Sequence, residues 1–307
     1  MIDRKVWYEN VDVLFEVIKS HMGGRETVFL PFAPDENGKL KSSPPVRWLL
    51  ANCIKFLQMH FERYRFLEQP MNLYYSLATY TQVPRFSYSW RIKSQEQAIW
   101  NVEFKNYIKA YDVLIETDSS DLKLSFADAI EIKRFLDKYN VVYRSSFSGS
   151  KGVHVVIPAS EFDWIGLKVY DEEAEKNVNF KQLLMTLPVT WGVGGREIGN
   201  IHLDKVLLAK CMTLRMKTLL SCDTIDTSVS DLKRIVKTPY SIDCKSGRVA
   251  LPLTDEQLMN FKKEMCDPEN VLSIIYKRGL LWRNLDVPKE TRQEGMKRML
   301  TDLGILK

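Results

Sequence analysis

The apolar positions of the chain follow strand spacing in some segments and helix spacing in others. Strand-like runs rich in β-branched and aromatic residues are Leu73–Pro84, Ala110–Ile115, Val141–Phe147 and His154–Pro158. Helical spacing is found over Val11–Met22, Val46–Phe66, Ser125–Tyr139, Asp204–Leu220, a stretch that starts near Asp255, and Lys289–Leu303. Because strands and helices alternate in the middle of the chain, we expect an α/β (α+β) protein whose sheet carries helices on one face.

Two acidic residues follow the run that ends at Ile115. Glu116 and Asp118 are two positions apart, so in an extended chain their side chains leave the same face. Carboxylates that converge can share divalent cations such as Mg²⁺, which prefers oxygen ligands. A polar strand end that faces water gives the same E-x-D pattern, so this pair alone decides little.

A Gly/Ser/Lys segment, Ser148–Gly152, joins the next two strand-like runs and predicts a tight hairpin turn. The hydroxyls of Ser148 and Ser150, the ammonium of Lys151 and the imidazole of His154 can all bind phosphate oxygens. An ordinary hairpin loop uses the same residue types, and a half-buried histidine is the plain alternative for His154. Both interpretations stay open on these residues alone.

A third stretch places an acid before a run of basic residues. Asp226 is followed by Val229-Ser230, Lys233, Arg234, Lys237, Pro239-Tyr240-Ser241 and Lys245-Ser246-Gly247-Arg248. Taken in order, the motifs E-x-D, S-G-S-K-G-x-H and D-x-x-V-S…K-x-P-x-S…K-S-G-R resemble those of the archaeo-eukaryotic primase superfamily. This superfamily contains small primase subunits and the primase-polymerases of plasmids and viruses. The resemblance covers Tyr111–Leu253, about half of the chain.

The resemblance implies a fold and a domain organisation. A primase-polymerase catalytic core with an RNA-recognition-motif-like sheet is expected over residues 96–253. An N-terminal α/β unit over residues 1–95 and a helical C-terminal segment over residues 254–307 would flank it, and the latter could lead into a further domain of a longer protein.

The resemblance also implies roles for individual residues. Glu116, Asp118 and Asp226 would hold two Mg²⁺ or Mn²⁺ ions for the attack of a 3′-hydroxyl on an α-phosphate. The residues that would grip the triphosphate of a dNTP or NTP are Ser148, Ser150, Lys151 and His154. Lys237 and Ser241 match the nucleotide-binding positions of the third motif, where a cation can neutralise the leaving pyrophosphate.

The chain departs from the family pattern at three points. Glu116 stands where the family usually has Asp, and Asp243 stands where many small primase subunits carry a phosphate-contacting His. The segment that follows the third acid is also one residue shorter than in many relatives. Asp223 and Asp231 are therefore rivals for the third acid, and we favour Asp226 because the D-x-x-V-S phrase follows it.

Composition agrees with this interpretation. The chain has 307 residues, a formal net charge of +5 and 45% hydrophobic residues, which suits a folded protein whose surface meets nucleic acid. Its five cysteines are scattered and form no C-x-x-C, so we expect free thiols in a reducing compartment. Small primase subunits carry a clustered Cys/His insert, which is missing between the first two motifs. We therefore predict no zinc and favour a plasmid- or virus-type primase-polymerase.

The expected function is that of a DNA primase/polymerase that starts or extends a strand on a single-stranded DNA template, with a primer strand and dNTP or NTP. The alternatives are an end-joining type repair polymerase and an inactive primase-like nucleic-acid-binding module. Converging carboxylates argue against the inactive module, since a phosphate-binding surface has little use for them. Candidate protein partners are a helicase, a large primase subunit or a fused accessory domain. The start of the chain has no apolar signal core, so we expect a cytoplasmic protein without a membrane partner.

Overall fold

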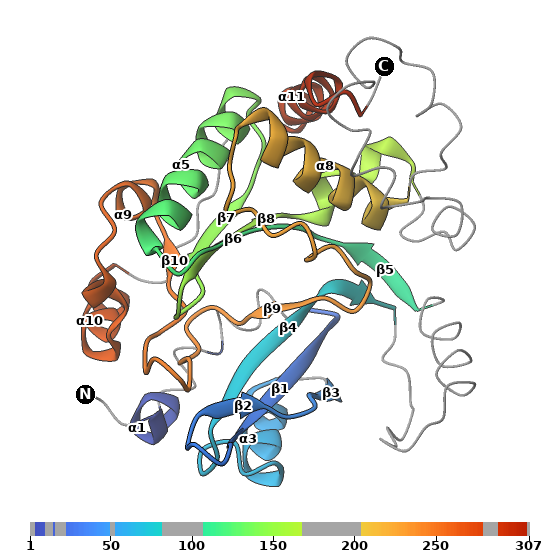
Figure 1. The fold of residues 1–307 in the computed structure, drawn as a ribbon. Coiled ribbons are helices and arrows are strands. Elements are labelled where there is room, and N and C mark those ends of the chain that lie inside the picture. Colours follow the sequence, from blue (N-terminus) through green and yellow to red (C-terminus); the bar gives the residue numbers. More distant parts are fainter. Residues whose placement is uncertain are drawn as a thin grey trace. The chain divides into compact units, whose positions relative to one another are not determined.

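The computed structural model describes residues 4–9, 15, 23–49, 53–81, 107–167, 204–278 and 288–305 (Figure 1). The chain divides into two compact units, and each is assembled from separate stretches of sequence. Unit 1 comprises Met1–Ala110, Lys233–Ala250 and Cys266–Leu280, and unit 2 comprises Tyr111–Leu232, Leu251–Met265 and Leu281–Lys307. The division into domains at about residues 95 and 253 stays a prediction.

Unit 1 is built on a sheet around two long antiparallel strands, β1 (Arg25–Pro34) and β4 (Met71–Tyr80). β2 (Leu40–Ser42) and β3 (Val46–Leu49) pair with β1, and β5 (Ile108–Tyr111) and β9 (Ile235–Lys237) lie next to β4. The helices among the described residues of this unit are α1 (Arg4–Glu9), α3 (Ile54–Arg63) and α10 (Pro268–Arg278). Tyr8 of α1, Phe61 of α3 and Phe29 of β1 all contact the ring of the fully buried Phe66, with ring centroids 4.5–5.0 Å apart.

The prediction of one helix over Val46–Phe66 is wrong at its start. Val46–Leu49 forms β3, in which Val46 pairs with Phe29 and Leu49 with Thr27. A short apolar run fits either a strand or a helix, and here pairing with β1 decides in favour of the strand. The predicted helix Val11–Met22 lies outside the described residues except for Phe15, and the predicted strand Leu73–Pro84 is confirmed as far as Tyr80.

Unit 2 contains an antiparallel sheet in the order β10-β7-β8-β6. Its strands are β6 (Val113–Asp118), β7 (Arg144–Phe147), β8 (Gly152–Ile157) and β10 (Pro252–Leu253). Helix α5 (Leu122–Lys138) packs on β6 and β8, and α8 (Lys205–Leu219) packs on β6, both from the same side of the sheet (Figure 1). The predicted α/β (α+β) class, with helices on one face of the sheet, is thus confirmed.

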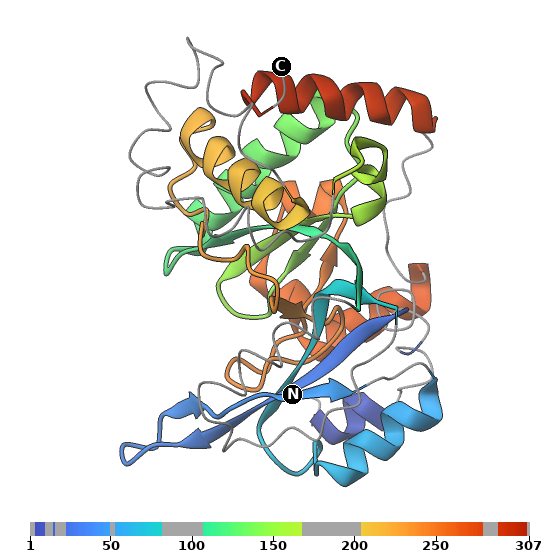
Figure 2. The same ribbon diagram turned by 90° about the vertical axis from the view of Figure 1, so that its right-hand side faces the viewer.

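Capping residues set the starts of three helices of unit 2. The carboxylate of Asp204 accepts a hydrogen bond from the backbone N–H of Leu207, and that of Asp121 accepts one from Lys123, so α8 and α5 begin directly after these acids. α9 (Asp255–Met259) begins after a capping box at Thr254. α11 (Lys289–Asp302) lies across the end of α5 (Figure 2), where a Cβ on its Gly295 would fall 1.7 Å from the carbonyl oxygen of Tyr139. Short 3-10 turns occur at Ala159–Glu161, Asp163–Ile165 and Lys263–Cys266.

Among the described helices, none combines the length and the apolar character needed to cross a bilayer.

Candidate active site

Strand β6 carries the first two predicted acids. Glu116 lies opposite His154 of β8, and Asp118 lies opposite Gly152. The strand continues to Asp118 instead of ending near Ile115, because β8 pairs with it along its whole length. Directly opposed residues of an antiparallel pair share a face, so His154 and Glu116 project together.

These side chains lie on the face of the sheet away from helix α5. Phe147 contacts Phe126 of α5, with ring centroids 6.2 Å apart, and pairs with Val153, which in turn pairs with Thr117. Thr117 therefore faces α5. Because neighbouring residues of a strand alternate, Glu116 and Asp118 point the other way.

The third predicted acid, Asp226, lies along the edge of β6 that β8 does not occupy. Ile225 forms an antiparallel bridge with Thr117, and the backbone N–H of Asp226 donates to the carbonyl oxygen of Glu116 at 2.9 Å. Asp226 is thus directly opposite Glu116, and its side chain leaves the same face. His154, Glu116 and Asp226 form one row across three neighbouring segments, with Asp118 in the next row.

The two rival acids hold other positions. Asp223 is exposed, and its carbonyl oxygen accepts a hydrogen bond from Lys217. Asp231 is also exposed, and its carbonyl oxygen accepts one from the hydroxyl of Tyr111. The register pairs Asp226 with Glu116, which supports Asp226 as the third acid; its role stays a prediction.

Each of the three carboxylates has an ion-pair or hydrogen-bond partner within unit 2. Lys151 Nζ is 2.9 Å from Asp118 Oδ2, and His154 Nε2 is 3.4 Å from Glu116 Oε1. Asp226 Oδ1 accepts hydrogen bonds from the backbone N–H and the hydroxyl of Ser228. In the part of the chain that the structure describes, Asp118 Oδ1 and His154 Nδ1 are buried and lack a hydrogen-bond partner.

The chemistry of this donor set suits a hard divalent cation. Carboxylate oxygens are the ligands that Mg²⁺ prefers, and a buried acceptor such as Asp118 Oδ1 is costly while it stays unsatisfied. As the side chains stand, no three or more His, Cys, Asp or Glu residues among those described are grouped closely enough to hold a metal. Asp118 and Asp226 would have to turn from Lys151 and Ser228 to bind one.

The turn between β7 and β8 is closed by its first residue. Ser148 Oγ accepts from the backbone N–H of Gly152 at 3.2 Å, and the Ser148 N–H donates to the Gly152 carbonyl at 2.9 Å. Gly149 has a φ of 87°, in the left-handed region that favours glycine. Ser148 therefore has a structural role, whereas Ser150 and Lys151 are exposed at the tip.

Gly152 allows β8 to approach β6 at Asp118. A Cβ at this position would lie 2.4 Å from the carbonyl oxygen of Thr117, a backbone atom that cannot move without shifting the strand. We expect Gly152→Ala to cost about 1–3 kcal/mol of unfolding free energy and to lower any activity that depends on Asp118. Urea unfolding measures this cost. Gly23→Ala, where no atom lies within 4 Å of the added Cβ, is the matched control and should be nearly silent; equal effects of both changes would contradict the expected clash.

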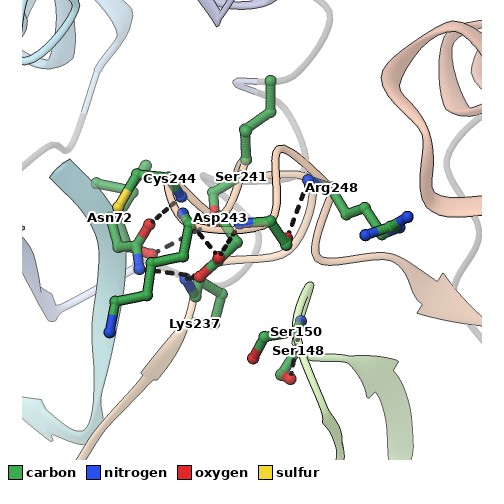
Figure 3. A network of polar contacts seen from close by, with 12 residues as sticks. Asn72, Ser148, Ser150, Lys237, Ser241, Asp243, Cys244 and Arg248 are labelled. Carbon is green, nitrogen blue, oxygen red and sulfur yellow. Dashed lines mark hydrogen bonds and ion pairs between the residues drawn. The ribbon is translucent and has the colours of Figure 1, made fainter. Parts of the chain in front are cut away.

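The structure places Lys237 and Ser241 inside unit 1, where Lys237 belongs to a buried polar network around Asp243 (Figure 3). Lys237 Nζ lies 2.7 Å from Asp243 Oδ2, and these side chains are only 4% and 6% exposed. Asn72 Nδ2 donates to the same oxygen at 3.0 Å. The hydroxyl of Ser241 donates to the carbonyl oxygen of Thr238 at 2.6 Å. Both predicted phosphate ligands are therefore bonded within unit 1, and their nucleotide-binding role stays a prediction.

Asp243, the residue found where many relatives have His, organises the K-S-G-R turn. Its Oδ1 accepts from the backbone N–H groups of Lys245 and Ser246 at 3.0 and 2.9 Å. Burial alone would raise the pKa of this carboxyl, but the Lys237 ammonium and the backbone donors hold it below its usual range. An Asp at the start of a Lys-Ser-Gly turn is itself a sequence signal for this arrangement.

Two residues outside every motif, Asp128 of α5 and Lys217 of α8, contact the segment that carries Asp226. No pattern in the sequence marks them, because helical charges of this kind are common on solvated faces.

No protein-family model and no curated protein sequence matches the chain. Among solved structures, the polymerase domain of Mycobacterium tuberculosis Ligase D, in complex with DNA, is 13% identical, with 93% of each chain covered and a TM-score of 0.52. The AEP domain of the cyanophage S-2L primase-polymerase is 10% identical, with 86% of this chain and 97% of that chain covered and a TM-score of 0.35, too low to compare folds. At 13% identity this likeness shows the fold: the chain has the fold of the Ligase D polymerase domain, as the resemblance to primase-polymerases implies.

Proposed function

We propose that this protein is a metal-dependent nucleotidyltransferase, a DNA primase/polymerase that adds nucleotides on a single-stranded template. The observation that carries the proposal is the row formed by Glu116 and Asp226 on one sheet face, with Asp118 next to it. The fold of a polymerase domain whose structure contains DNA supports it. An inactive binding module is disfavoured because three carboxylates on one face repel phosphates unless cations neutralise them.

Glu116, Asp118 and Asp226 are the residues that would hold Mg²⁺ or Mn²⁺. When bound there, such an ion supplies charge stabilisation for in-line transfer of a nucleotidyl group to a 3′-hydroxyl. The exposed Lys151 and the buried His154 flank these acids and would bind the triphosphate, since ammonium and imidazole N–H groups donate to phosphate oxygens. Ser150 at the tip of the turn would add a hydroxyl, as would Ser148 if it exchanged its contact with Gly152.

Lys151 has two competing partners in this proposal. It pairs with Asp118 at 2.9 Å, and both side chains are partly exposed, so the pair itself contributes little stability. A triphosphate carries more negative charge and offers Lys151 a better partner. Nucleotide binding would thereby release the Asp118 carboxylate, so that nucleotide and metal bind in a linked manner.

Lys151→Ala and His154→Ala should mainly weaken nucleotide binding. Each change removes a hydrogen bond to the triphosphate worth about 1–3 kcal/mol, which is about five- to a hundred-fold in apparent affinity. Calorimetric titration with nucleotide in the presence of Mg²⁺ measures this loss. Lys123→Ala, which removes another exposed cation from the first turn of α5, is the control and should bind normally. Unchanged nucleotide affinity combined with weaker DNA binding would show that the hairpin faces the strand instead.

The proposed function is tested by incubating the purified protein with single-stranded DNA, labelled dNTP or NTP, and Mg²⁺ or Mn²⁺, with and without a primer. Incorporation that depends on template and metal is the expected result. DNA binding without any incorporation would favour the inactive module.

A second candidate, a repair polymerase of the end-joining type, is favoured by the likeness to the Ligase D polymerase domain. A gapped substrate with a 5′-phosphate, compared with the same substrate carrying a 5′-hydroxyl, distinguishes it from a primase: only the repair polymerase should prefer the phosphate. The choice between dNTP and NTP, a cytoplasmic location, and a helicase or large primase subunit as partner remain predictions.

A further inference from the structure

The third acid lies on a segment with little regular structure of its own. After α8 ends, Ser221 adopts a φ of 53°, and only the bridge at Ile225 is part of a sheet. A carboxylate on such a segment keeps its place only if neighbouring elements hold the backbone. Two backbone hydrogen bonds tie this segment to β6, and further contacts come from two helices.

Asp128 of α5 holds the segment from one side. Its Oδ2 accepts two hydrogen bonds from Thr224, one from the backbone N–H at 2.8 Å and one from the hydroxyl at 2.7 Å. The carbonyl oxygen of Thr224 in turn accepts from the backbone N–H of Asp118 at 2.9 Å. A continuous path of hydrogen bonds thus runs from α5 through Thr224 to β6.

Lys217, in the last turn of α8, holds the same segment through its carbonyl groups. Its Nζ donates to the carbonyl oxygens of Asp223 at 2.9 Å and Ile225 at 2.8 Å, on both sides of Thr224. Hydrogen bonds from or to a charged group are about twice as strong as neutral ones. Asp128 and Lys217 together hold the backbone of residues 223–225, which leads directly into Asp226.

We propose that Asp128 and Lys217 are positioning residues that keep Asp226 in register with Glu116 and so set the affinity of the site for divalent cations. This inference rests on the proposed function, in which these carboxylates hold the metal. Neither residue belongs to the apolar core, since both side chains are partly exposed. Residues that orient metal ligands typically change metal affinity about 10- to 100-fold when they are removed.

The test measures Mn²⁺ binding to the purified full chain by electron paramagnetic resonance, without nucleotide or DNA. Asp128→Ala and Lys217→Met should each weaken Mn²⁺ binding by about tenfold or more. In synthesis assays, the Mn²⁺ concentration that gives half-maximal activity should rise to a similar extent. Glu131→Gln is the matched control: it removes an exposed carboxylate about one turn further along the same helix, where Glu131 pairs with Arg134, and should bind Mn²⁺ like the wild type.

Asp226→Asn separates this inference from the proposed function. If Asp226→Asn binds Mn²⁺ as the wild type does, the metal site itself is misassigned. If Asp226→Asn loses Mn²⁺ while Asp128→Ala and Lys217→Met bind it normally, the positioning role is overturned. Should either variant fail to fold, Thr224→Val takes its place, because it removes only the hydroxyl group that donates a hydrogen bond to Asp128. It should weaken Mn²⁺ binding a few-fold, and wild-type binding by Thr224→Val would equally overturn the inference.

Discussion

Replacing Asp118 or Asp226 by Asn should lower nucleotide incorporation by about 10³-fold or more while the protein stays folded. The amide keeps the shape of the side chain but removes the charge that a Mg²⁺ ligand requires, a loss of several kcal/mol in the transition state. Stability should change by less than about 1 kcal/mol. The Lys151 pair lost in Asp118→Asn is partly exposed, and removing one of several neighbouring carboxylates relieves repulsion. Primer extension and thermal unfolding measure the two effects.

Asp223→Asn and Asp231→Asn are the matched controls for this prediction. Both replace one carboxylate oxygen of an exposed Asp in the same region by an NH2 group, and neither residue is opposed to β6 by the register that pairs Asp226 with Glu116. Both should retain nearly full activity. Loss of incorporation in Asp223→Asn or Asp231→Asn, with an active Asp226→Asn, would mean that the third acid is misplaced.

The second large effect is expected on stability. Lys237→Met should lower the free energy of unfolding by about 3 kcal/mol, because it leaves the Asp243 carboxylate buried without its cation. Urea unfolding followed by fluorescence measures this loss. The lowered pKa of Asp243 makes the stabilisation by the Lys237–Asp243 pair depend on pH. This stabilisation is fully present above the ordinary pKa of an Asp carboxyl and is lost as the pH falls through the lowered pKa of Asp243.

Lys245→Met provides the control, since it also removes a cation from this turn. The Lys245 side chain is exposed, and its Nζ lies 4.7 Å from the centre of the Phe32 ring. This change should cost less than about 1 kcal/mol. The double variant Lys237→Met/Asp243→Asn should recover part of the stability, because no buried charge is then left unpaired and the amide oxygen still accepts from the backbone N–H groups of Lys245 and Ser246. Unchanged stability of Lys237→Met together with weaker nucleotide binding would show that Lys237 acts as a phosphate ligand and not as a support of the fold.

The positions that could be predicted from the sequence are those fixed by local pattern. The alternating run before Glu116 and the glycines around Ser150 gave strand β6 and the turn between β7 and β8, because both depend on neighbours close in sequence. The start of α8 was likewise predictable, since Asp204 is a strong capping residue.

The positions that could not be predicted depend on distant parts of the chain. Val46–Leu49 was expected to be helical and became a strand through its pairing with β1. The opposition of Asp226 and Glu116 is invisible in the sequence, because the segment that carries Asp226 has no strand periodicity. Lys237 and Ser241 matched a phosphate-binding pattern, yet burial and internal hydrogen bonds, which no local pattern reveals, occupy both side chains in the structure.

The interleaving of the two units affects how the chain can fold while it is being synthesised. In unit 1, Asp243 bonds to Asn72, 171 residues earlier, and β9 pairs with β4 over a similar separation. Until the ribosome has produced this later stretch, the part of β4 that β9 covers, Tyr74–Ser76, has an open edge that can pair with other chains. A fragment that ends before residue 235 would carry this open edge permanently. Expression of shortened chains should therefore yield aggregates, and variants are best studied in the full sequence.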